Sequence, residues 1–123
     1  MSNLATSLLQ VQKQIKAVEK SASNPYFKSN YVPLDAIMEF LLPLWNDAGL
    51  IVQQNVNVIL SELSEPTQVL SLRIIHAESG EVQESNMLLP MVGKPQEQGS
   101  MITYYRRYQL SSTFLIVGDE DDD

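Results

Sequence analysis

The spacing of the apolar residues changes abruptly at Gly49, and this change constrains the fold more than any other feature of the chain. Before Gly49, apolar residues recur every three or four positions, which is typical of helices that bury one face. After it, apolar and polar residues alternate, which is typical of strands with one face toward water. Because the helices and strands form separate blocks rather than alternating, we expect an α+β domain.

Two amphipathic helices are expected before Gly49. The first covers residues 4–18 and has an apolar stripe made of Leu4, Leu8, Val11, Ile15 and Val18. The second begins at Pro33, because a proline in the first turn sacrifices no hydrogen bond. Its predicted buried face consists of Leu34, Ile37, Met38, Leu41, Leu42 and Trp45. Pro43 is expected to kink or interrupt this helix, and Gly49 to end it.

Three strands and a last helix are expected after Gly49. The first strand directs one set of apolar side chains to a single face: Val52, Val56, Val58 and Leu60. The second strand runs through residues 68–76, and a tight turn at Ser79-Gly80 leads to the third, which begins at Val82. Short connections predict an antiparallel meander. A Pro/Gly loop over 90–100 then precedes a helix over 100–113, so the expected order is helix, helix, three strands, helix.

Length and residue usage limit the class of protein. The 123 residues fit one domain, which we assign to residues 1–118, followed by an acidic tail at 119–123. The chain has no cysteine, which excludes disulfides and thiolate metal sites, and its one histidine, His76, is interpreted as structural. The first residues lack the pattern of a signal peptide, and no apolar run approaches the roughly 18 residues of a membrane span. We expect a soluble protein inside the cell.

The net charge of −7 is unevenly distributed. Five of the fifteen acidic residues form the run 119–123, which leaves ten acids against eight bases, a net charge of −2 for the rest. The tail has three interpretations: a solvated, disordered end, a mimic of DNA, or a binding site for a divalent cation. The remaining domain is nearly neutral, so its few basic residues can form local patches.

Residues 98–110 read QGSMITYYRRYQL and contain the most unusual cluster of the chain. On a helix, Tyr105 and Tyr108 are predicted to face the core, whereas Tyr104, Arg106 and Arg107 lie on the polar side. Such a helix has two interpretations. Its tyrosines pack and its arginines pair with acids, or its arginines bind phosphates and its rings stack on the bases of a single strand. Gly99 and Ser100, placed at the helix start, offer amides for a phosphate.

The loop over 24–31, NPYFKSNY, repeats this combination of rings and positive charge with Tyr26, Phe27, Lys28 and Tyr31. Burial of the rings is the structural alternative, but packing does not account for Lys28. Lys94 lies between Gly93 and Pro95 in a second loop, where a lone lysine is ordinarily just solvated.

A set of segments in a fixed order resembles the essential recombination function (ERF) family of bacteriophage single-strand annealing proteins. The segments are NPYFKSNY at 24–31, PLDAI at 33–37, GL at 49–50, HAESGE at 76–81, QGSMITYYRRY at 98–108 and DEDDD at 119–123. The resemblance implies a β-β-β-α core, binding of single-stranded DNA, annealing of complementary strands without ATP or another cofactor, and assembly into rings or helical filaments. It also implies a place in the cytoplasm of a bacterial host.

The matching positions imply a nucleic-acid-binding set: Lys28, Ser29, Tyr31, Gly99, Ser100, Thr103, Tyr104, Arg106 and Arg107, to which we add Lys94 from its loop position. We expect no catalytic residue and no metal site, and therefore not an enzyme. Two alternatives remain open. One is a module that recruits host recombination or single-strand-binding proteins. The other is a metal-dependent nuclease, which would need carboxylates fixed around paired metals about 4 Å apart.

Overall fold

The computed structural model describes residues 2–20, 32–63 and 65–116, and for residues 16–20 the backbone alone. Its elements are α1 (Asn3–Lys20), α2 (Leu34–Asp47), β1 (Leu50–Ile59), β2 (Thr67–His76), β3 (Val82–Leu88) and α3 (Pro95–Thr113). The expected α+β class and the order of the elements are confirmed. The predicted sites at Lys28, Ser29, Tyr31 and 119–123 lie outside the described residues.

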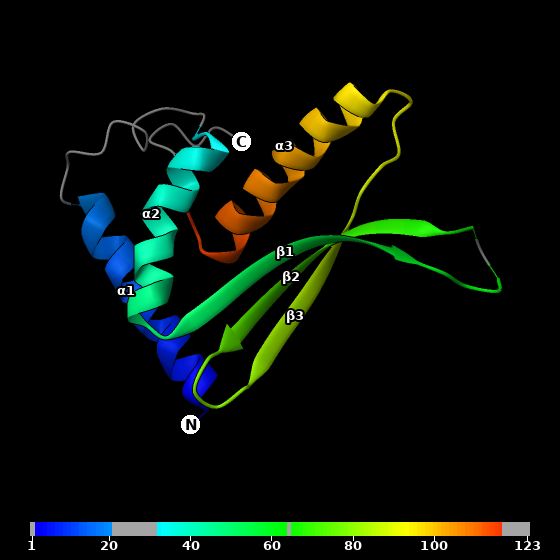
Figure 1. Cartoon of the computed structure of the whole chain (residues 1–123). Coiled ribbons are helices and arrows are strands. Elements are labelled where there is room, and N and C mark those ends of the chain that lie inside the picture. The colour runs from blue at the N-terminus through cyan, green and yellow to red at the C-terminus, as the bar shows by residue number, and fades with distance from the viewer. Residues whose placement is uncertain (1, 21–31, 64, 117–123) are drawn as a thin grey trace.

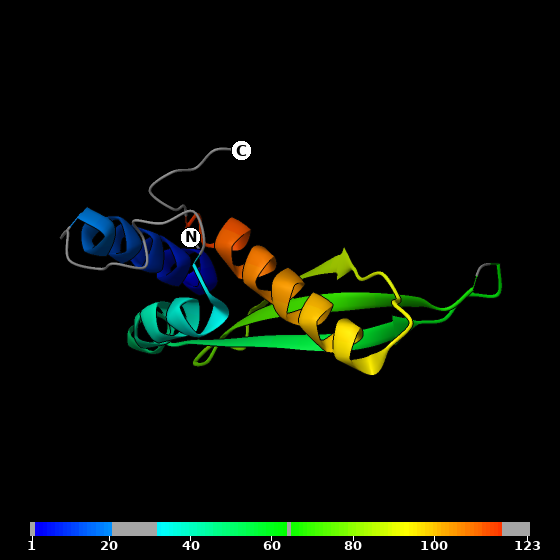
Figure 2. The same cartoon turned by 90° about the horizontal axis from the view of Figure 1, so that it is seen from above.

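The sheet is an antiparallel meander in the order β1-β2-β3. Its helices lie on one side: α1 and α2 stand at the end that holds the β2–β3 turn, and α3 crosses toward the other end (Figures 1 and 2). Glycines occupy two of the connections, one between α2 and β1 and one between β2 and β3. Gly49 has φ 75° and Gly80 has φ 80°, conformations that other residues rarely adopt. Gly49 therefore ends the α2 segment, and Gly80 makes the predicted turn.

The core lies between the helices and the inner face of β2. From α1 it receives Leu4, Val11 and Ile15, all of which are buried. Two side chains hold the start of this helix: Ser2 Oγ accepts a hydrogen bond from Ala5 N at 2.9 Å, and Glu81 Oε1 accepts one from Leu4 N at 2.9 Å. Polar side chains thus satisfy amides that the first turn of a helix leaves free.

For α2, the expected burial of Leu42 is wrong, and of the kink or interruption expected at Pro43 the interruption does not occur. Leu42 is 47% exposed, because it lies at the edge of the buried stripe that Ile37, Leu41 and Trp45 define. Pro43 does not interrupt the helix, which continues to Asp47. Proline removes one hydrogen bond near the end of this helix, and the packing of Leu41 and Trp45 on either side holds both turns in place.

The expected apolar face of β1 is buried only in its first half. Val52 is half-buried, whereas Val58 is 58% and Leu60 is 76% exposed, and Val56 is exposed as well. The β1–β2 hairpin is longer than the layer of helices and extends past α3 (Figure 1). Strand alternation is therefore a reliable guide to the face of each side chain but not to what covers that face.

Helix α3 starts five residues earlier than expected, at Pro95 rather than at residue 100. Pro95 occupies the first turn, where its fixed φ favours helix, and Glu97 lies near the positive end of the helix dipole. Residues 95–99 were assigned to a Pro/Gly loop, although proline followed by an acidic residue is an N-terminal helix signal.

Candidate nucleic-acid interface

The cluster at 104–108 lies on α3, and the structure divides it between the two sides of the helix. Tyr104 and Tyr108 are 51% and 56% exposed, whereas Gln109 and Leu110 are 3% and 0% exposed and define the buried side. The prediction that Tyr108 faces the core is therefore wrong. It lies one helical turn from Tyr104 and points outward with it, while Tyr105 is half-buried.

We call Tyr104, Arg107 and Tyr108 the tyrosine patch. The rings of Tyr104 and Tyr108 are nearly parallel, with centroids 6.2 Å apart and planes inclined by 11°. The rings of Tyr105 and Tyr104 meet at right angles with centroids 5.5 Å apart, and the guanidinium carbon of Arg107 lies 5.2 Å from the centroid of the Tyr104 ring. These contacts fix the orientation of Tyr104 while leaving about half of it accessible.

Arg106 points the other way, toward β1, and is held by the side chain of Gln54. Its Nε donates to Oε1 of Gln54 at 3.1 Å. Gln54 Nε2 in turn donates to Gln109 Oε1 at 2.8 Å and to the main-chain oxygen of Arg106 at 3.2 Å. Gln109 Nε2 donates to the oxygen of Leu70 on β2 at 3.0 Å. We call this series of hydrogen bonds (Leu70, Gln109, Gln54, Arg106) the amide relay. Its uncharged groups fix the orientation of the Arg106 guanidinium.

An open cleft of about 550 Å³ lies beside Arg106, between α3 and the start of α2. Its lining residues are Pro33, Leu34, Asp35, Met38, Thr103 and Arg106. The cleft brings together Thr103 and Arg106 from the predicted site, but it also contains the carboxylate of Asp35, which accepts a hydrogen bond from Ala36 N. Arg106 and Arg107 therefore lie in different surroundings, one half-buried beside the cleft and one on the tyrosine patch.

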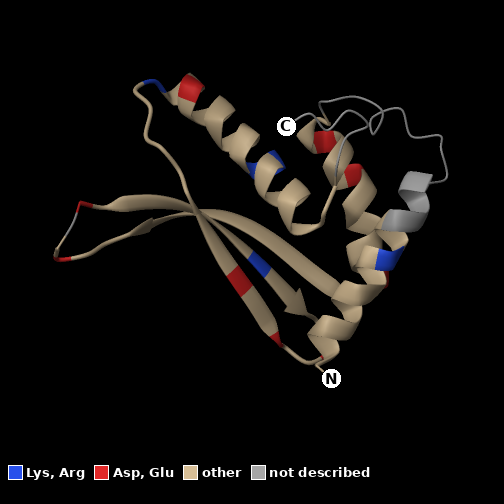
Figure 3. Ribbon diagram, turned by 180° about the vertical axis from the view of Figure 1, so that it is seen from behind, with Lys and Arg blue, Asp and Glu red and all other residues tan. Residues whose placement is uncertain are grey.

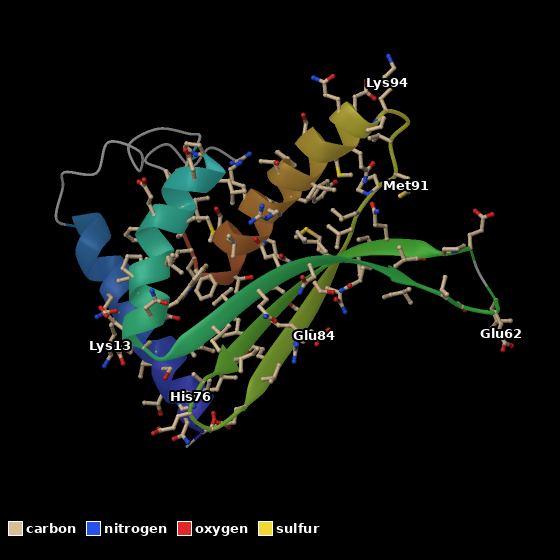
Figure 4. The ribbon with its side chains drawn as sticks, viewed as in Figure 1. Lys13, Glu62, His76, Glu84, Met91 and Lys94 are labelled. Atoms are coloured by element: carbon tan, nitrogen blue, oxygen red, sulfur yellow. The ribbon has the colours of Figure 1, made fainter. Side chains whose placement is uncertain are left out.

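Gly99 and Ser100 do not lie at the start of the last helix, so the prediction of a phosphate site there is wrong. Gly99 and Ser100 lie inside α3, so their amides belong to the helical hydrogen-bond ladder, and both residues are exposed. Lys94 occupies the N-cap position of α3, without a capping hydrogen bond from its side chain, and projects from the far end of the helix (Figure 4). The structure therefore does not bring Lys94 together with the tyrosine patch.

The charge on α3 is locally positive. Residues 98–113 contain Arg106 and Arg107 and no acidic residue. Figure 3 shows acidic colour on α3 only near its first turn. On the sheet face away from the helices, Arg73 Nε lies 3.6 Å from Glu84 Oε1 on the next strand. The stretch 98–113 of an overall negative chain thus carries a net charge of +2.

His76 has a structural role, as expected. It is 9% exposed, and its Nδ1 accepts a hydrogen bond from Ser79 N at 3.1 Å, which stabilises the β2–β3 turn.

The described residues contain no group of three or more His, Cys, Asp or Glu side chains that would suit a metal ion. Among the described helices, none combines the length and apolar composition needed to cross a membrane.

Sequence reasoning did not identify Gln54 or Gln109 as site residues. Gln54 belongs to an alternating strand and Gln109 to a polar helix segment, and neither position distinguishes a buried relay from a solvated amide. The only signal was indirect: Arg106 is adjacent in sequence to Arg107, so the two point about 100° apart on a helix and require different partners.

Replacing Gln54 with leucine is expected to lower the free energy of unfolding by about 1–3 kcal/mol, because Gln109 Oε1 and Arg106 Nε lose their partner. Chemical denaturation measures this change. Gln53→Leu is the matched control, since Gln53 is the exposed neighbour on the opposite face of β1. Equal effects of the two substitutions would show that the relay contributes nothing.

The fold and the α3 surface together define a small α+β domain whose last helix presents arginine and tyrosine above a three-stranded antiparallel sheet. The chain belongs to the ERF superfamily, whose family model matches residues 4–123, nearly the whole chain. No curated protein and no solved structure matches it. Membership supports a general role in phage recombination, and the resemblance noted in the sequence is confirmed.

Proposed function

We propose that this chain binds single-stranded DNA and anneals complementary strands without ATP, as an oligomer, in the cytoplasm of a bacterial host. The observation that carries the proposal is the acid-free stretch 98–113 of α3, which presents Arg107 and two exposed tyrosines in a member of this family. Arginine binds phosphate oxygens and exposed rings stack on bases, so both parts of a nucleotide have a partner on one helix.

Annealing in this proposal requires no covalent step, and the protein is therefore not an enzyme. Contacts to the phosphates hold a strand without reading its sequence. Base pairing then supplies the specificity. The hydroxyl groups of Ser100 and Thr103 lie on α3 and would add neutral contacts along the path of the strand. Thr103 and Arg106 would meet it at the cleft beside α2.

Oligomerisation compensates for the small number of basic residues on each subunit. Repeating the α3 surface along a ring or filament multiplies weak contacts into strong binding. Leu4, Val11 and Ile15 on the stripe of α1 are buried in the chain's own core and are not available to a neighbouring subunit. The open edges of β1 and β3 and the exposed hairpin end are the better candidates.

A second candidate function is supported by the hairpin between β1 and β2. Leu60 and Leu63 at its end are 76% and 96% exposed. Exposed apolar side chains of this size are typical of surfaces that bind proteins. A module that recruits host recombination or single-strand-binding proteins would use this end rather than α3.

Pairing of two complementary fluorescent strands tests the proposal. We expect the full chain to accelerate pairing without ATP, equally in magnesium and in a chelator. Faster loss of strand length in magnesium alone would instead identify a nuclease. If neither pairing nor strand length changes, the recruitment function is favoured, and Leu60→Ser with Leu63→Ser is then expected to abolish binding of the protein partner.

A further inference from the structure

The tyrosine patch contains a ring that the sequence assigned to the core, and its geometry suits a flat ligand. Tyr108 is 56% exposed beside Tyr104, and the two rings lie within 11° of parallel. A planar group that stacks on one ring is therefore aligned with both. The large aromatic side chains Trp45 and Phe114 are buried in the core, so the exposure of this pair is a local feature of α3.

The charge beside the rings identifies the ligand class. Arg107 lies 5.2 Å from the centroid of Tyr104, and the stretch 98–113 contains no carboxylate to oppose an anion. A ligand with a flat ring next to a negative group matches both features, and a nucleotide of single-stranded DNA is such a ligand. A purely apolar protein surface would have no use for the adjacent cation.

We propose that Tyr104 and Tyr108 form a stacking site for a nucleobase of single-stranded DNA, with Arg107 beside it for the neighbouring phosphate. This inference rests on the proposed function and adds Tyr108 and the orientation of the base. A base bound by its face keeps its hydrogen-bonding edge free. The strand is therefore held in a form that can still pair, which annealing requires.

The orientation of Tyr104 is set before any ligand arrives. The Tyr105 ring packs against it at right angles with centroids 5.5 Å apart, Arg107 lies over its ring, and Tyr108 is nearly parallel to it. A ring that is already ordered loses little side-chain entropy on binding, so more of the stacking energy appears as affinity. Exposure of Tyr104 and Tyr108 also means that neither ring is needed to fill the core.

Binding of a fluorescent dT oligonucleotide and of an abasic oligonucleotide of equal length separates stacking from phosphate contacts. We expect the native chain to bind dT about 5- to 150-fold more tightly than the abasic strand. The double variant Tyr104→Ala, Tyr108→Ala should lose that preference, and Tyr104→Phe, Tyr108→Phe should retain it. Equal binding of both oligonucleotides by the native chain, or a preference that survives in the alanine variant, would overturn the inference.

Two further readouts keep the outcome unambiguous. The first is cross-linking of the native chain to a 5-iodouracil oligonucleotide, which needs no substitution. We expect adducts at Tyr104 or Tyr108. Adducts confined to other residues would contradict the proposed stacking site. Failure to bind either oligonucleotide refutes the proposed function and with it the site. A change of oligomeric state in the alanine variant, with base preference intact, would assign the patch to subunit contacts instead.

Discussion

Replacing Trp45 with alanine is expected to lower the free energy of unfolding by about 3–5 kcal/mol, the largest effect of any single substitution considered for this chain. The side chain is 2% exposed, and its ring lies 5.3 Å from that of Phe114, the residue that caps α3. Removal of the indole leaves a cavity between α2 and the end of α3. Because a domain of this size has about 5–15 kcal/mol in total, the variant should be marginally folded.

Denaturation in urea followed by circular dichroism measures the loss for Trp45→Ala. Leu42→Ala is the matched control, because Leu42 lies on the same helix but is 47% exposed, and we expect it to change stability by about 0.5 kcal/mol or less. A Trp45 variant as stable as the Leu42 variant would mean that the α2–α3 contact is not part of the cooperative core.

The sequence predicted the order and class of the elements because these depend on periodicity, and periodicity is local. Gly49 and Gly80 were recognised as turn positions for the same reason: their positive φ values are a requirement that few other residues meet. How far the helices extend over a strand, by contrast, is not determined by residues that are near in the sequence. Nothing in the alternation of Val56, Val58 and Leu60 reveals that the helices end before these residues do.

The predicted sides of α3 are wrong for Tyr108 and Arg106, because the buried side of this helix is partly polar. Gln109 is 3% exposed and Arg106 is half-buried, so the side that faces the sheet resembles a solvated one in the sequence. Tyr105 and Tyr108 carry large, mainly apolar rings, and the helical spacing therefore predicts that both face the core. Burial of Gln109 is stable only because Leu70 O and Gln54 satisfy its amide, and those partners lie about 39 and 55 residues away along the chain.

The separation of the two arginines leads to the second large effect. We expect Arg107→Ala to weaken binding of single-stranded DNA by about 10-fold or more, because a hydrogen bond to a charged group contributes about 1.5–3 kcal/mol. Arg106→Ala should instead lower stability as well, by about 1–3 kcal/mol, because it leaves Gln54 Oε1 without its donor. Fluorescence anisotropy and thermal unfolding measure the two quantities.

The salt dependence of binding shows whether these losses come from phosphate contacts. For a single strand, each phosphate that a cation neutralises adds about 0.7 to the slope of log affinity against log salt, so Arg107→Ala should reduce the slope by about that amount per subunit. Arg73→Ala removes the same charge from the opposite face of the sheet, where Arg73 pairs with Glu84, and should leave the slope unchanged. Equal slopes for the Arg107 and Arg73 variants would mean that general charge, rather than a contact on α3, attracts the DNA.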